Sequence, residues 1–137
     1  MTLSIALGAR ATMLNGFETF MAAGLAATLV IRQTNLVLAT FILNNPPFQA
    51  ASNDSVILTT PPISVAAVAS GNANNFLMNN QTAALALSGT ISSIGGGGDI
   101  EAPSVAITSA VSQRLNTFIL RMASNGQLTV EASLTLV

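Results

Sequence analysis

The stretch 115-LNTFILRMASNGQLTVEASLTLV-137 decides the fold. Leu115–Met122 is rich in large apolar and β-branched residues, and Gln127–Val137 alternates apolar with polar side chains. Such alternation is typical of a strand with one face on a core and the other in water. Asn125-Gly126 between them is a strong signal for a two-residue type I′ turn. We therefore expect an antiparallel hairpin here.

The side chains of this hairpin can be assigned to faces from their spacing. Arg114 and Arg121 are seven residues apart, and an odd separation places them on opposite faces of one strand. One of the two is placed to form an ion pair with Glu131 on the neighbouring strand. The inward side chains of the last strand are predicted to be Leu128, Val130, Ala132, Leu134 and Leu136.

Short apolar segments separated by turn residues continue this pattern toward the N-terminus. In the segment that begins at Thr82, we expect Ala83, Leu85, Leu87 and Ile91 on one face. Turns are expected at Thr34-Asn35, Pro46-Pro47, Pro61-Pro62 and Ser70-Gly71-Asn72. The further predicted strands are Ala26–Arg32, Leu36–Leu43, Val56–Thr60, Ile63–Ala69, Asn74–Asn79, Thr82–Ile91 and Ser104–Thr108.

The first part of the chain differs, because its apolar residues recur at helical spacing. Leu3, Leu7, Leu14, Phe17 and Met21 predict a helix from Leu3 to about Ala23 with one apolar face. Ser4 is expected to cap its start and Gly24 to end it in a left-handed conformation.

Arg10 falls within that apolar face, so its side chain must reach water or a partner.

The strands and turns listed above predict a chain that is mainly β. A helix in residues 1–24, packed on the domain or extending from it, precedes an antiparallel β-sandwich or jelly-roll-like domain of eight or nine short strands in residues 25–137.

The composition points to assembly. Charged residues make up 7 % of the 137-residue chain, against roughly 25 % in an ordinary soluble domain, and the 44 residues between Asp54 and Asp99 carry no charge. A free monomer usually has a charged surface of mixed sign, so copies of this chain or a partner are expected to cover much of its exterior. Four arginines without a lysine argue against nucleic-acid binding. No apolar run is long enough to span a membrane.

The residue types also argue against an enzyme. Histidine, cysteine and lysine are absent, so the commonest general bases, nucleophiles and zinc ligands are missing. No cofactor or metal is expected. A carboxylate-dependent enzyme is the remaining catalytic alternative.

One motif raises the question of a ligand. Gly95, Gly96, Gly97 and Gly98 stand directly before Asp99, but the lysine of a phosphate loop is missing and acidic residues follow where a phosphate would lie. Asp99 and Glu101 would face the same way on a strand and could bind a cation, although an oxygen cage usually needs six or more ligands. We interpret residues 95–99 as a flexible connecting loop that can form an interface.

Several short segments together resemble a family of small structural proteins of tailed-bacteriophage virions, encoded among head and tail genes. The similarity runs over most of the chain and departs from the family in residues 44–68. The matching residues are Ser4, Ala6, Arg10, Leu14, Glu18, Leu29–Arg32, Val37–Thr40, Gly89-Thr90, Gly95–Asp99 and Thr117–Leu120.

The resemblance implies a protein located in the virion that binds the major capsid protein or other virion proteins. A capsid decoration (cement) protein that also forms a homo-oligomer is the favoured interpretation. The alternatives are a tail, neck or fibre-associated protein and a carbohydrate-binding module, for which the asparagine-rich segment Asn72–Gln81 is the only sequence signal.

Overall fold

The computed structural model describes residues 3–24, 26–82 and 84–137. These ranges contain one helix, α1 (Leu7–Met21), and eleven strands, so the protein is mainly β as predicted. The strands are β1 (Thr28–Gln33), β2 (Leu36–Ile42), β3 (Ser55–Ile57), β4 (Ile63–Ala66), β5 (Gly71–Asn72), β6 (Asn75–Asn79), β7 (Leu85–Ser93), β8 (Ile100–Ala102), β9 (Ala106–Ile107), β10 (Ser112–Met122) and β11 (Leu128–Thr135).

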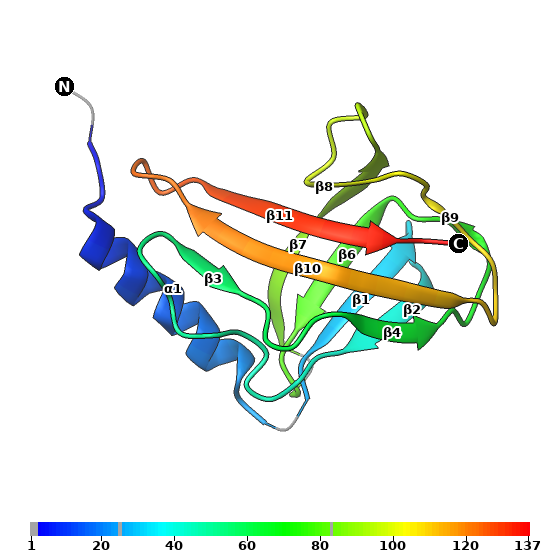
Figure 1. The fold of residues 1–137 in the computed structure, drawn as a ribbon, viewed down its shortest axis with the longest axis horizontal. Coiled ribbons are helices and arrows are strands. Elements are labelled where there is room, and N and C mark those ends of the chain that lie inside the picture. The colour runs from blue at the N-terminus through cyan, green and yellow to red at the C-terminus, as the bar shows by residue number, and fades with distance from the viewer. Residues whose placement is uncertain (1–2, 25, 83) are drawn as a thin grey trace.

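Two sheets face each other as a β-sandwich. One has the order β2-β1-β6-β7-β8, and in the other β10 lies between β11 on one side and β3 and β4 on the other. Figure 1 shows β10 and β11 crossing over β1, β6 and β7 at a steep angle. Strands β5 and β9 form a separate short pair. The sandwich with an N-terminal helix confirms the predicted fold class.

A chain of four phenylalanine rings joins the helix to both sheets. Phe17 of α1 contacts Phe48, whose ring centroid is 5.4 Å away, and Phe48 contacts Phe118 of β10 at 5.9 Å. Phe118 in turn meets Phe76 of β6 edge to face at 6.5 Å. Phe48, Phe76 and Phe118 are fully buried, so these contacts form the centre of one core.

The helix begins later than its sequence pattern predicts. The helix starts at Leu7 instead of Leu3, and neither Ser4 nor the N-cap residue Ala6 caps it with a side chain. The Ile5 N–H instead donates to the carbonyl of Ser124, so the chain before α1 is tied to the β10–β11 hairpin and not to the helix.

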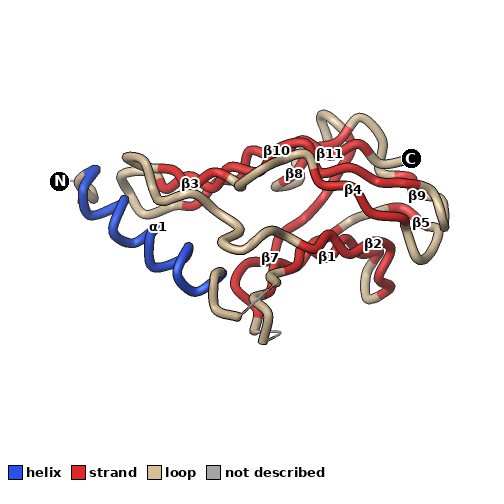
Figure 2. The backbone as a smooth tube through the Cα atoms, turned by 60° about the horizontal axis from the view of Figure 1, so that its bottom comes forward, coloured by secondary structure: helices blue, strands red, loops and turns tan. Residues whose placement is uncertain are grey.

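The predicted apolar face of the helix is correct over its second half. Leu14 and Met21 are each 1 % exposed and join the core, whereas Leu3 is 87 % exposed. Figure 2 shows α1 as a separate layer beside β3 at one end of the sandwich. Gly24 has the predicted positive φ, of 94°, and the predicted boundary at residue 25 lies outside the described residues.

A bulge in β10 makes the prediction for its two arginines wrong. The register of β10 against β11 shifts between Leu115 and Thr117, which adds one residue to β10. The extra residue reverses the alternation, so buried positions change from odd to even numbers along the strand. Arg114 and Arg121 therefore face the same side, away from the core.

A second bulge changes the face of Leu85. The register between β6 and β7 shifts beside Asn79, so Leu85 is 55 % exposed while Leu87 packs against the core. Ala83, which was assigned to the same face, lies outside the described residues.

The hairpin turn forms where it was predicted but with another geometry. Only Gly126 has a positive φ, of 86°, and its N–H donates to the carbonyl of Ala123. A three-residue loop with glycine in the left-handed position is the type I turn with a bulge, not type I′.

Short strands account for the remaining differences. Gly71 and Asn72 form β5, not a turn, and β9 covers only two residues of the predicted strand 104–108. Strand β8 was not predicted, and its pairing with β7 is parallel. Pieces of two or three residues are too short to leave a periodic signal in sequence.

Replacing Phe118 by alanine tests the central contact of the core. The substitution removes a fully buried ring that lies between the rings of Phe48 and Phe76. We expect the free energy of unfolding to fall by about 3–5 kcal/mol, measured by chemical denaturation. Phe20→Ala on the exposed side of α1 is the control and should change it by less than about 1 kcal/mol.

Candidate functional site

The glycine run forms the connection between β7 and β8. The chain enters the loop from β7 and leaves it along β8, and the two strands lie side by side in parallel. In Figure 1 the loop projects beyond the edge of the sandwich. Parallel neighbours usually need a long crossover, so the six residues from Ile94 to Asp99 must reverse the chain twice in little space.

The four glycines meet two different requirements. Gly95 and Gly97 have φ values of +87° and +81°, which side chains rarely allow. Gly96 and Gly98 have ordinary φ values, but a Cβ on either would lie within 3 Å of Ser92. Each position therefore favours glycine, and the loop has a defined conformation. Its role as an interface stays a prediction.

The backbone of this loop forms an anion-binding nest, and the protein fills it with its own carboxylate. Glu101 Oε2 accepts hydrogen bonds from the N–H groups of Gly95, at 2.7 Å, and Gly97, at 3.4 Å. The Gly96 N–H between them donates to the carbonyl of Ser93. Backbone N–H groups that converge on one point hold phosphates in other proteins. The acidic residue that follows the run therefore occupies the position of an anionic ligand.

Asp99 closes the base of the loop. Its Oδ2 accepts from the N–H of Thr90 at 2.8 Å and from the Thr90 hydroxyl at 3.1 Å. The Asp99 N–H donates back to Thr90 Oγ1, and the Gly98 N–H donates to Ser92 Oγ. Both partners come from β7, so the loop is fixed along the strand that precedes it.

The predicted residues 95–99 are thus brought together, but sequence reasoning missed Thr90 and Ser92 as their partners. No spacing rule predicts which hydroxyls of β7 face a loop that has not yet been placed. Asp99 and Glu101 do share a face, on either side of the buried Ile100. Within the described ranges, no three acidic residues come close enough together to hold a metal ion.

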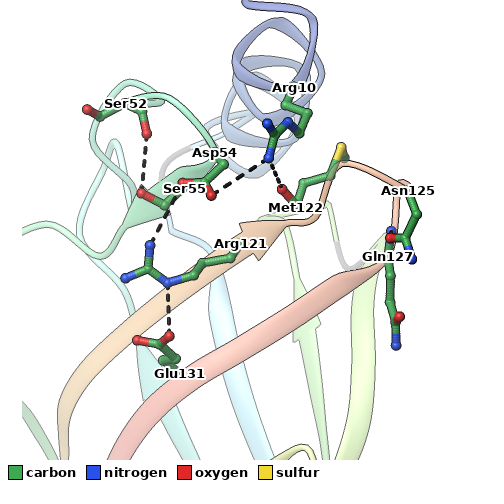
Figure 3. Close-up of polar contacts among 9 residues, drawn as sticks. All are labelled: Arg10, Ser52, Asp54, Ser55, Arg121, Met122, Asn125, Gln127 and Glu131. Atoms are coloured by element: carbon green, nitrogen blue, oxygen red, sulfur yellow. Dashed lines mark hydrogen bonds and ion pairs between the residues drawn. The ribbon is translucent and has the colours of Figure 1, made fainter. Parts of the chain in front are cut away.

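A second polar cluster joins the helix to the opposite sheet (Figure 3). Asp54 lies 3.8 Å from both Arg10 of α1 and Arg121 of β10, and Arg121 Nε donates to Glu131 Oε1 at 2.9 Å. The predicted pair with Glu131 is therefore confirmed, with Arg121 as the cation. The hydrogen bond from Arg121 and the charge of Glu131 raise the pKa of the Arg121 guanidinium above its usual value.

Arg10 lies on the apolar face of α1, and its charged group finds polar partners on the neighbouring elements. Its side chain is 14 % exposed, and Nη1 donates to the carbonyl of Met122 at 3.2 Å while facing Asp54. Its Nε is buried without a hydrogen-bond partner among the described residues. Arg10 therefore fixes α1 against β10 at the cost of one unpaired donor.

The asparagine-rich segment is occupied by structural hydrogen bonds. Asn75 accepts from Arg32 Nε and donates to the carbonyl of Thr34. Asn80 is 5 % exposed and accepts from the hydroxyl of Thr82. These two amides hold the neighbouring turns together.

No protein-family model, curated protein or solved structure matches this chain. The one described helix, of 15 residues, is not long and apolar enough to cross a membrane.

Two Gly→Ala substitutions, one in the glycine loop and one in the helix, are expected to change stability in opposite directions. Gly98→Ala places a Cβ 2.8 Å from the Ser92 backbone nitrogen, so we expect a loss of about 1–3 kcal/mol in the free energy of unfolding. Gly16→Ala in the exposed part of α1 meets no atom and should add up to about 1 kcal/mol. Equal effects in a denaturation series would contradict the role assigned to Gly98.

Replacing Asp54 is expected to cost more stability than replacing Arg10, although the two residues form one ion pair. Asp54→Ala leaves Arg10 half-paired and poorly solvated, and we expect it to cost about 1–3 kcal/mol in stability. Arg10→Met keeps the apolar stem and removes the unpaired Nε, so it should remain within about 1 kcal/mol of the wild type. Thermal unfolding of both variants tests this order, and equal losses would show instead that the ion pair itself is the main stabilising term.

Proposed function

We propose that this chain is a structural protein of a tailed-bacteriophage virion, and within it a capsid decoration protein. Its partners are the major capsid protein and copies of itself. The proposal rests on the resemblance of the sequence segments described above and on one feature of the surface, the outer face of the five-stranded sheet.

That outer face is almost free of charge. Arg32 is the only charged residue in β1, β2, β6 and β7, and it lies at one end of β1. Across the other end, Ile42, Thr28, Asn79 and Leu85 stand side by side in register. Ile42 and Leu85 are 63 % and 55 % exposed, so large apolar side chains flank amides and hydroxyls on this face.

A face of this kind suits permanent burial against a shell. Away from Arg32, contact with a partner removes no ion from water, and the apolar side chains gain from leaving it. Burying charge would instead require matched charges on the partner. When a shell repeats the same subunit many times, many weak contacts of this kind together resist expansion of the particle.

A tail, neck or fibre-associated role is the alternative, because the same face could pack within a smaller assembly. Copy number separates the two roles. Quantitative mass spectrometry of purified virions encoding this chain should give a copy number comparable to that of the major capsid protein. A dozen copies or fewer would move the protein to the neck or tail, and its absence from virions would overturn the proposal.

Charge placed on the outer face should block incorporation into particles without unfolding the chain. We expect Ile42→Glu or Leu85→Glu to lower the number of copies per particle by about tenfold or more, because an unpaired carboxylate would be buried at the contact. Thr117→Glu, on the exposed side of β10 in the other sheet, is the matched control. Unchanged incorporation of both face variants would show that another surface binds the shell.

A further inference from the structure

The two sheets have four edges, and three of them are protected against pairing with another chain. The outer side of β2 is bent by a bulge beside Arg32 and receives a hydrogen bond from Val68 N–H at the carbonyl of Leu38. Strand β3 is flanked by residues 48 and 49, through the bond from Gln49 N–H to the carbonyl of Ile57. Strand β8 is only three residues long. Such features are the usual protection of sheet edges.

Strand β11 has no such protection over its first half. It is an edge strand of eight residues without proline, lysine or a bulge of its own. Figure 1 shows β8 near the part of β11 closer to the C-terminus, while the part next to the hairpin stands clear. Leu128, at its start, is 44 % exposed although it belongs to the inward face.

The hairpin determines which backbone groups point outward. Ala123 N–H donates to the carbonyl of Gln127, and hydrogen-bonded pairs alternate along an antiparallel ladder. Residues Leu128, Val130 and Ala132 therefore direct their N–H and C=O groups away from β10. No backbone group in residues 3–24, 26–82 or 84–137 bonds to these three on the outer side.

We infer that β11 pairs antiparallel with β11 of a second copy of this chain, about a two-fold axis at Val130. The sheets that contain β10 and β11 in the two copies then form one continuous sheet. Val130 then faces Val130 of the second copy, and Leu128 faces Ala132 of the second copy. These are the residues whose backbone groups point outward, so about six new hydrogen bonds form, two for each facing pair. The exposed Leu128 gains an apolar neighbour.

The charges on the solvent face are compatible with this register and disfavour the one with its axis at Glu131. With the axis at Val130, Glu131 lies opposite Thr129 of the second copy, whose other neighbour is Arg121 of that copy. Moving the axis one residue toward the C-terminus, to Glu131, would place Glu131 directly opposite its own equivalent, and like charges facing each other destabilise a strand pair. A second copy therefore fits this edge with alternating and not opposing charges.

A proline substitution tests the pairing without disturbing the chain's own ladder. Val130→Pro removes an N–H that points outward, and proline is tolerated on an edge strand in that position. In sedimentation experiments over a wide concentration range, we expect the wild type to form dimers and Val130→Pro to remain monomeric with an unchanged circular dichroism spectrum. A monomeric wild type, a closed oligomer without two-fold pairs, or a folded Val130→Pro dimer would overturn the inference.

Cysteine cross-linking decides the matter if the proline variant does not fold. The native chain has no cysteine. Two copies of Val130→Cys would have Cα atoms about 5.5 Å apart, within disulfide range. Ser133→Cys is the control, because its two copies would lie about 20 Å apart. Rapid cross-linking of Val130→Cys alone supports the pairing, whereas its failure, or equal cross-linking of both variants, overturns it.

This inference does not depend on the proposed role in the virion. Dimers that are absent from virions would overturn the proposed function and leave the β11 interface standing. A protein found in many copies per virion that does not cross-link at residue 130 would do the reverse.

Discussion

The contact of Phe118 with Phe48 on one side and Phe76 on the other is the constraint on which the structure depends. Phe118 comes from one sheet and Phe76 from the other, while Phe48 relays the contact to Phe17 of the helix. The ring of Phe118 therefore fixes the separation of the sheets and the position of α1 together. The bulge in β10 serves the same contact, because without the extra residue Phe118 would face away from the core.

A chain with so few charges uses nearly all of them inside its own structure. Arg10, Asp54, Arg121 and Glu131 form one connected cluster that joins the helix to the hairpin. Asp99 and Glu101 hold the glycine loop, and Arg32 holds an asparagine of β6. The outer face of the five-stranded sheet is left with amides, hydroxyls and apolar groups. Solubility of such a surface depends on what covers it, which is the physical basis for proposing an assembly protein.

The spacing of apolar residues in the sequence predicted the features that are built from long, regular helices and strands. The sequence predicted the order of the longer strands, the helix, the C-terminal hairpin and an ion pair between Glu131 and one of two arginines, and the structure identifies that arginine as Arg121. Periodicity failed where one residue interrupts the repeat, as the faces of Arg114 and Leu85 show, because a bulge is a local response to packing between sheets. It also missed β5 and β8 and made β9 too long, because strands of two or three residues leave no periodic signal in sequence.

The glycine run shows how far composition alone can go. The sequence contained the right clue, an acidic residue placed where a phosphate would bind, but not the geometry that explains it. Without an anion the exposed N–H groups of Gly95 and Gly97 would bond to water, and Glu101 supplies an anion from within the chain. The two left-handed glycines turn the donors toward Glu101, and the other two allow the loop to lie against Ser92. In this chain the side chain of Glu101 takes the place that an anionic ligand takes in a phosphate-binding loop, and the loop serves as a tight connection between two parallel strands.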